Sequence, residues 1–291
     1  MLQSPISDKT LLEFIAVMIR LIRYFLAMSV LVGLVACESS RNKDTNKDDT
    51  KEVTFTMVQY NVGVFSKYDV SSVSAVASAI KEMGADVVTL NELDSCATRT
   101  GNVYQLEAFA NAMGNWKYHY ASAMPFQGGA YGVGVASRPE WNIVRTDKVI
   151  LPKYDGREPR ALAVVEYDDF IICSTHLDLT EQAQLGQVAS INNYINTQYA
   201  DCRKPIFLGG DFNCLPDSQP IAYLRQSWAL LTPRSATYPS AEPKKSIDFI
   251  FVKKNGNVVN VEQTSVPQTL ETTNLTTASD HLPVVLTVRI N

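Results

Sequence analysis

The chain has 291 residues, of which 46% are hydrophobic and 19% are charged, and its formal net charge is −4. This composition is typical of a globular protein and excludes a low-complexity or collagen-like chain. Because tight binding along a nucleic acid requires clustered lysines and arginines, the acidic balance also disfavours an extended nucleic-acid interface, although it does not exclude a nuclease.

The first 37 residues have the layout of a secretory signal. Arg20 and Arg23 precede an apolar run over residues 25–36, which ends in small residues. A basic segment followed by an apolar segment and small residues is typical of a signal peptide. At 12 residues the run is shorter than the roughly 20 that span a bilayer as a helix. Met18 begins a more typical signal than Met1 does, which favours Met18 as the natural start.

The signal ends in residues 34–37 (LVAC), which resemble a bacterial lipobox. In such a motif the cysteine becomes the first mature residue and is lipid-modified, so we expect Cys37 to anchor an exported protein to a bacterial membrane, in the periplasm or at the cell surface. An ordinary cleaved signal with a chance cysteine is the first alternative, and an uncleaved anchor is the second, less favoured one. Residues 38–52 contain no apolar side chain and therefore predict a flexible tether, with the folded domain over residues 53–291.

Four further cysteines follow the signal: Cys96, Cys173, Cys202 and Cys214. Export would permit disulfides between them, but their spacing leaves the pairing open. Cys173 lies in an apolar run and is predicted to be a small core residue. None of the four has the paired spacing of a structural zinc site.

The folded domain is predicted to consist of many strands with a few helices between them. Apolar runs and alternating patterns predict strands, and apolar residues at helical spacing predict helices. In chain order the strands are expected at residues 53–60, 86–90, 131–136, 142–150, 161–166, 170–175, 205–208, 247–252, 258–263 and 283–290, and the helices at residues 70–83, 103–113, 180–199 and 218–224. This order suggests an α+β fold, a four-layer α/β/β/α sandwich with two sheets face to face and helices outside, although other mixed folds also fit the pattern.

Polar residues recur at or near the ends of the predicted strands. They are Asn61, Glu92, His176, Asp178, Asp211, Asn213, Asp248, Asp280 and His281. Strand ends on one edge of a sandwich can converge on a single pocket. Carboxylate and amide oxygens suit a hard cation such as Mg²⁺. Hydrolysis of a phosphate ester needs such an ion, a base for water and donors for the phosphoryl oxygens, and this set of residues matches those needs.

Each of these residues also has a purely structural interpretation as a turn residue, a strand cap or a surface acid. Asp248 is different, because a carboxylate flanked by bulky apolar residues is costly to bury without a partner. The chain has only three histidines, and two of them, His176 and His281, fall among the polar residues at the strand ends. The third, His119, is predicted to be structural.

The motifs that hold these residues resemble, in the same order, those of the endonuclease/exonuclease/phosphatase superfamily. This group includes deoxyribonuclease I, apurinic endonucleases, neutral sphingomyelinases and inositol polyphosphate 5-phosphatases. The motifs are QYN (59–61), NEL (91–93), YGVGVASR (131–138), STHLD (174–178), GGDFN (209–213), IDFIF (247–251) and SDH (279–281). The resemblance covers residues 53–291 and implies a deoxyribonuclease I-like sandwich.

The resemblance implies a role for each matching residue. Glu92 would be the main ligand of Mg²⁺, with Mn²⁺ or Ca²⁺ as alternatives, and Asn61 and Asp280 would lie near the same or a second metal ion. Asp211 would orient or deprotonate the attacking water. Asn213 would hold a phosphoryl oxygen.

Further roles concern the histidines and their partners. His281 would contact the phosphate and be oriented by Asp248, which would explain a carboxylate in an apolar strand. His176 would stabilise charge or assist the leaving group, with Asp178 as its partner. Asp178 would also contact the substrate. Arg160 would also face the phosphate.

The sequence therefore predicts a monomeric, metal-dependent phosphatase or phosphodiesterase that acts on small-molecule or lipid phosphoesters. An extracellular nuclease is the first alternative and would need a basic strip, for which residues 244–245, Arg138 and Arg160 are the candidates. A non-catalytic binding module is the second. A lipid substrate would need an exposed apolar loop near the pocket. The candidates for that loop are Trp141, Trp228 and residues 124–126.

Overall fold

A computed structural model describes residues 52–65 and 73–291. The predicted signal, Cys37 and all but the last residue of the predicted tether lie outside these ranges. Residues Thr50–Asn291 form one compact unit. No helix in the described ranges is long and apolar enough to cross a membrane.

Two six-stranded sheets make up the centre of this unit. The first has the order β11-β12-β1-β2-β4-β3 and the second the order β5-β6-β7-β8-β10-β9. The strands of the first sheet are β1 (Val53–Asn61), β2 (Val87–Ser95), β3 (Lys117–Phe126), β4 (Gly129–Ser137), β11 (Val259–Ser265) and β12 (Val284–Ile290). The strands of the second are β5 (Ile143–Leu151), β6 (Arg160–Tyr167), β7 (Ile171–His176), β8 (Ile206–Asp211), β9 (Trp228–Leu230) and β10 (Asp248–Lys253).

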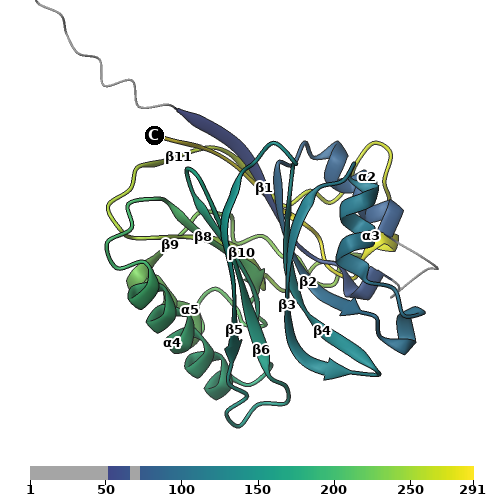
Figure 1. Cartoon of the computed structure of the whole chain (residues 1–291), viewed down its shortest axis with the longest axis horizontal. Coiled ribbons are helices and arrows are strands. Elements are labelled where there is room, and N and C mark those ends of the chain that lie inside the picture. Colours follow the sequence, from purple (N-terminus) through teal and green to yellow (C-terminus); the bar gives the residue numbers. More distant parts are fainter. Residues whose placement is uncertain (1–51, 66–72) are drawn as a thin grey trace, which may run out of the picture. The chain divides into compact units, whose positions relative to one another are not determined.

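Helices cover the outer faces of the two sheets, as Figure 1 shows. They are α2 (Val73–Glu82), α3 (Gln105–Ala112), α4 (Glu181–Gln198), α5 (Gln219–Ser227) and the short α6 (Leu275–Ala278). The first two pack on the first sheet, and α4 and α5 pack on the second. The layers are therefore helix, sheet, sheet and helix, which confirms the predicted sandwich.

Alternation along the strands builds the core between these layers. In β1, Phe55 and Met57 point into the interface between the sheets, whereas Val58 and Tyr60 point toward α2 and α3. The Phe55 ring stacks on the ring of Phe170, which directly precedes β7 of the second sheet; the ring centroids are 4.2 Å apart. Central strands are thus buried on both faces, which explains their long apolar runs.

Strand direction brings the polar strand ends together. Strand β1 runs parallel to β2, and β7 runs parallel to β8, so each pair ends at the same edge of its sheet. Strand β10 runs antiparallel to β8 and begins where β8 ends, with Asp248 opposite Asp211. Strand β12 runs antiparallel to β1, so the residues just before Val284 reach that edge as well.

The structure corrects the predicted elements in a few places. Strands β3 and β9 and helix α6 were not predicted. Strand β3 is the edge strand of its sheet, and its half-buried residues do not alternate cleanly between apolar and polar. The four cysteines at 96, 173, 202 and 214 are all free thiols, and Cys173 is buried in the core as predicted.

Phe55→Ala is expected to lower the free energy of unfolding by about 3–5 kcal/mol, because it opens a cavity between the two sheets. Thr54→Ala is the matched control, because Thr54 precedes Phe55 in the same strand and its side chain is exposed. Its free energy of unfolding should change by no more than about 0.5 kcal/mol. Urea denaturation of the protein without its signal measures both. Equal, small losses would contradict the placement of Phe55.

Candidate active site

A pocket of about 530 Å³ lies at the edge where the polar strand ends meet. Its lining residues are Glu92, Tyr131, Glu158, Arg160, His176, Leu179, Asp211, Asn213, Tyr238, Lys245, Ile247, Asp280 and His281. Every predicted site residue in the described ranges belongs to this lining, except Asn61, Asp178 and Asp248. These three are fully or almost fully buried and hydrogen-bond to the lining residues or to the backbone next to them.

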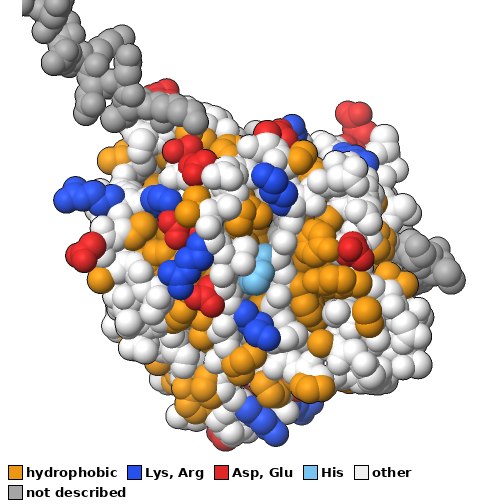
Figure 2. All heavy atoms as spheres, viewed as in Figure 1, with side chains coloured by type: hydrophobic (Ala, Val, Ile, Leu, Met, Phe, Trp, Pro, Cys, Tyr) orange, Lys and Arg blue, Asp and Glu red, His pale blue; other side chains and the backbone are white. Residues whose placement is uncertain are grey.

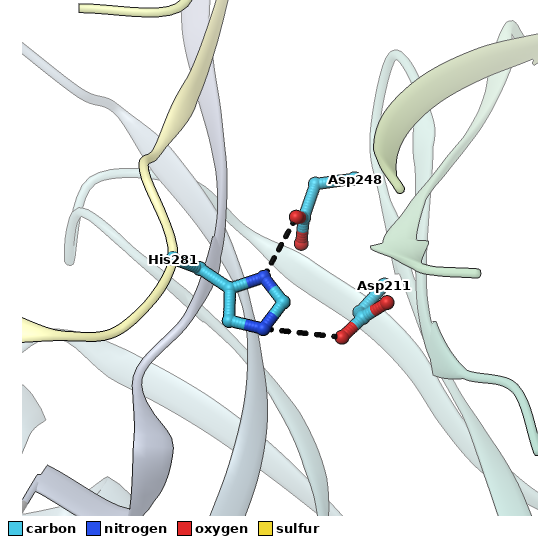
Figure 3. Close-up of side chains that lie close together, drawn as sticks. All are labelled: Asp211, Asp248 and His281. Atoms are coloured by element: carbon cyan, nitrogen blue, oxygen red, sulfur yellow. Dashed lines mark hydrogen bonds and ion pairs between the residues drawn. The ribbon is translucent and has the colours of Figure 1, made fainter. Parts of the chain in front are cut away.

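A histidine lies between two carboxylates that come from the other sheet (Figure 3). His281 precedes β12, and its Nδ1 is 2.8 Å from Oδ2 of Asp248, while its Nε2 is 3.6 Å from Oδ2 of Asp211. Asp248 also accepts a hydrogen bond of 2.6 Å from the Thr237 hydroxyl. The carboxylate that the sequence places among apolar neighbours therefore has the imidazole partner that was expected.

Burial and charge set the protonation of this group. Burial alone would lower the pKa of His281, but the carboxylates of Asp248 and Asp211 outweigh it and raise that pKa to about 9. Burial, with Asp248 next to it, raises the pKa of Asp211 well above the ordinary value for an aspartate, against the pull of His281. The two carboxylates therefore favour the protonated form of His281, and burial favours the protonated form of Asp211.

Asp211 lies between both histidines of the site. Its Oδ2 is 3.6 Å from Nε2 of His176 as well as from Nε2 of His281, and it accepts a hydrogen bond of 3.0 Å from the Asn61 amide. Nδ2 of Asn213 is 2.9 Å from Nε2 of His176 and also donates to the Leu177 carbonyl. Groups from both sheets thus surround one fully buried carboxylate.

Glu92 points into the pocket through an unusual backbone conformation. Its φ of 56° lies in the left-handed region, which is strained for a residue other than glycine. The pairing of β2 with β4 shifts register between Leu90 and Leu93 at this point. The amide of Asn61 donates to the Glu92 carboxylate over 3.1 Å. The bulge therefore places Glu92 beside Asn61 at the pocket wall.

A buried polar network joins the two sheets behind the pocket. Gln59 donates to Oδ1 of Asn91 over 2.6 Å and accepts from the Thr89 hydroxyl. The same Oδ1 of Asn91 accepts from the backbone N–H of Asp211 over 2.9 Å, and the Asn91 amide donates to the Thr175 carbonyl. These contacts fix Asp211 relative to the first sheet. The sequence contains these residues in its motifs, but nothing in their pattern predicted this role.

Asp178 holds a loop and does not line the pocket. Its carboxylate accepts hydrogen bonds from the backbone N–H groups of Arg157, Glu158 and Leu179. Burial opposes ionisation, but these donors keep the pKa of Asp178 below its ordinary value. A Cβ added at Gly156 would meet the carboxylate at 2.6 Å, so the loop closes tightly over it. The structure therefore gives Asp178 a positioning role for the loop that leads to Arg160, in place of the expected contact with substrate.

Arg160 is a buried cation with a donor left over. It is 5% exposed, and its Nη1 is 3.5 Å from the Glu158 carboxylate and 3.4 Å from Nδ1 of His176. Among the residues that the structure describes, its Nε has no hydrogen-bond partner. Since buried donors are nearly always satisfied, this N–H suits an oxygen of a bound molecule.

A larger hollow of about 830 Å³ lies at the opposite edge of the second sheet. It is lined by residues near the start of β8 and the end of β10, and it contains none of the motif residues. The smaller pocket is therefore the candidate active site.

The sequence profile described as "Endonuclease/Exonuclease/phosphatase family" matches residues 56–281. The chain belongs to this family. Comparison with curated protein sequences finds no match. The family assignment therefore rests on the profile together with the arrangement of the motif residues in the pocket.

Solved structures share the fold. An endonuclease/exonuclease/phosphatase family protein from Bacteroides thetaiotaomicron has 15% identity and a TM-score of 0.67, covering 83% of this chain and 96% of that one. The mannosyl-6-phosphatase Bt3783 of the same species has 16% identity and a TM-score of 0.67, covering 80% and 99%. The human Nocturnin catalytic domain, with bound sulfate anion, has 14% identity and a TM-score of 0.61, covering 82% and 97%.

The donor set of this family member fits a hard divalent cation. Glu92 and Asp280 line the pocket, and Asn61 adds an amide beside Glu92. Asp211, Asp248 and His281 form a second compact group, whose ligand atoms lie within 4.8 Å of one another. Those atoms already bind each other or Thr237, however, and the group is almost fully buried, so it is better explained as a hydrogen-bonded relay.

Asp248→Asn is expected to lower the pKa of His281 from about 9 toward the ordinary histidine value, because burial then opposes the imidazolium charge with one carboxylate fewer. NMR titration of the imidazole C–H signals in chelator-treated protein measures this. His119, whose ring contacts the Asp147 carbonyl, is the internal control and should not shift. An unchanged titration of His281 would contradict the pairing.

Proposed function

We propose that the chain is a divalent-metal-dependent hydrolase of phosphate esters, acting as a phosphatase or phosphodiesterase on small soluble substrates. The observation that carries the proposal is the Asp211 carboxylate, which is buried at the pocket floor between two imidazoles, each 3.6 Å away. A base with a raised pKa, surrounded by donors for an oxyanion, is what hydrolysis of a phosphate ester requires.

In this proposal Asp211 accepts the proton of the attacking water. Its raised pKa brings a carboxylate closer to the proton affinity of a base that works near neutral pH. The phosphoryl oxygens would accept hydrogen bonds from Nε of Arg160, the amide of Asn213 and the protonated His281, and His176 would assist the leaving oxygen. A divalent ion held by Glu92, Asp280 and Asn61 would neutralise charge on the phosphoryl group.

The positions of the basic residues disfavour the nuclease alternative. Arg138 pairs with Asp86 over 2.9 Å at the edge opposite the pocket, and Lys244 pairs with Glu242 over 2.8 Å. Among the described residues that line the pocket, the lysine and arginine side chains are those of Arg160 and Lys245. On the face shown in Figure 2, basic side chains are interspersed with acidic and apolar ones and form no continuous strip.

A membrane-lipid substrate is disfavoured by the packing of the expected apolar loops. Trp228 is fully buried, and Trp141 packs on Phe55 and Phe170. Phe126 lies under the Arg99 guanidinium, 4.3 Å away. None of these side chains is therefore arranged to enter a bilayer, which supports a soluble substrate.

We also propose that the protein is exported, anchored through Cys37 and active as a monomer. Strand β1 enters at Val53, paired with Ile290, and ends at Asn61 beside the pocket. At about 3.3 Å per residue, its nine residues separate the tether end of the domain from the pocket by roughly 30 Å. An anchor at that end would favour substrates that arrive from solution.

A panel of substrates tests the proposed function. The protein without its signal is incubated with Mg²⁺ or with a chelator and given sugar and inositol phosphates, a generic phosphodiester, sphingomyelin, RNA and plasmid DNA. Chelator-sensitive hydrolysis of small phosphoesters, with intact plasmid, is the expected result. Nicked plasmid would favour the nuclease, and the absence of turnover on every substrate would favour a binding role.

Asp211→Asn is expected to lower kcat by about 10²–10⁴-fold on whichever substrate is hydrolysed, since the amide cannot accept the proton. Asp217→Asn is the control, because the Asp217 side chain is 84% exposed and forms an ion pair with Arg234, away from the pocket lining. Thermal unfolding should confirm that both variants fold. Activity of Asp211→Asn comparable to the parent protein would contradict the assigned base.

A further inference from the structure

A hairpin beside the pocket is hydrogen-bonded both to the residues that precede β12 and to Asp248 of β10. We call residues 237–245 the rim hairpin. Tyr238 and Lys245 pair through their backbones at its base. Ser240 donates its backbone N–H to the Asp280 carbonyl over 2.7 Å and its hydroxyl to the Ser279 carbonyl over 2.6 Å. Since Thr237 also donates to Asp248, the hairpin has a fixed position relative to the catalytic groups.

Two side chains of the rim hairpin line the pocket. The Tyr238 ring lies 4.8 Å from the His281 ring, between centroids. Lys245 is exposed, and within the described part of the chain it forms no ion pair. The adjacent Lys244 differs in both respects, because it forms an ion pair with Glu242 and does not line the pocket. One of two adjacent lysines is therefore available to a bound molecule.

The arginine and the lysine among the described pocket residues lie at different depths. Arg160 is 5% exposed and contacts His176, so under the proposed function it serves the reacting phosphate. Lys245 is exposed at the rim and has no such contact. Four carboxylates are among the described residues of the pocket lining, and no ion pair joins one of these four to Lys245. Under the proposed function, a substrate whose only anionic group is the reacting phosphate would contact Arg160 and the protonated His281 and would leave Lys245 unused.

We propose that Lys245 is a specificity-determining residue that binds a second anionic group of the substrate, a phosphate or a carboxylate, at the rim of the pocket. This inference rests on the proposed function and names its substrate class: small phosphate esters that carry a further negative charge. The rim hairpin holds Lys245 in place, so binding costs less ordering than it would on a free loop.

Lys245→Gln tests this, with Lys244→Gln as the matched control. The substrates are a hexose 1,6-bisphosphate and the corresponding hexose 6-phosphate, each with Mg²⁺. Lys245→Gln should raise KM for the bisphosphate by about 5- to 10-fold, as expected for one partly exposed charge pair, with kcat and the KM for the monophosphate unchanged. Lys244→Gln should change neither KM.

Binding measured by calorimetry separates the inference from the proposed function. In an Asp211→Asn background, adding Lys245→Gln should weaken the bisphosphate and leave the monophosphate unchanged, whether or not the parent protein turns either over. An equal loss for both ligands would place Lys245 at the reacting phosphate and overturn the inference, as would no loss for either. Absence of hydrolysis by the parent protein, with selective binding retained, would count against the proposed function alone.

Discussion

The burial of the Asp211 carboxylate is the constraint on which the site depends. A carboxylate taken out of water needs nearby donors or cations, and here Asn61, His176 and His281 surround it. These groups come from both sheets, so the two sheets must meet in one register. Gly209 belongs to the same requirement: a Cβ there would meet the Thr89 hydroxyl at 2.4 Å, so only glycine allows β8 to approach the first sheet this closely.

Sequence predicted most of the fold and most of the pocket, for a physical reason. Polar residues that follow an apolar strand stand out, and in this topology such strand ends converge. Asp248 was the most informative single residue, because a carboxylate among apolar neighbours requires a polar partner. That partner is His281, whose Nδ1 lies 2.8 Å from the Asp248 carboxylate. The edge strand β3 was not predicted, because most of its residues are half-buried and its sequence does not alternate cleanly between apolar and polar residues.

Other features depend on three-dimensional context that a pattern does not carry. The left-handed backbone of Glu92 arises from a register shift between neighbouring strands. Asp178 turns toward backbone N–H groups of its own loop rather than toward the pocket. Lys245 and Lys244 are equivalent in sequence and differ only in where the hairpin places them. Under the proposed function, the buried Arg160, the exposed Lys245 and a tether about one strand length from the pocket are the features that support small anionic substrates from solution.

A crystal structure with Mn²⁺ and inorganic phosphate would test the central claim most directly, since Mn²⁺ is located by its anomalous signal. The ion is expected on Glu92 and Asp280, with phosphate in the same pocket and one of its oxygens at Nε of Arg160. An ion bound among Asp211, Asp248 and His281, or phosphate bound only in the hollow at the opposite edge, would contradict it.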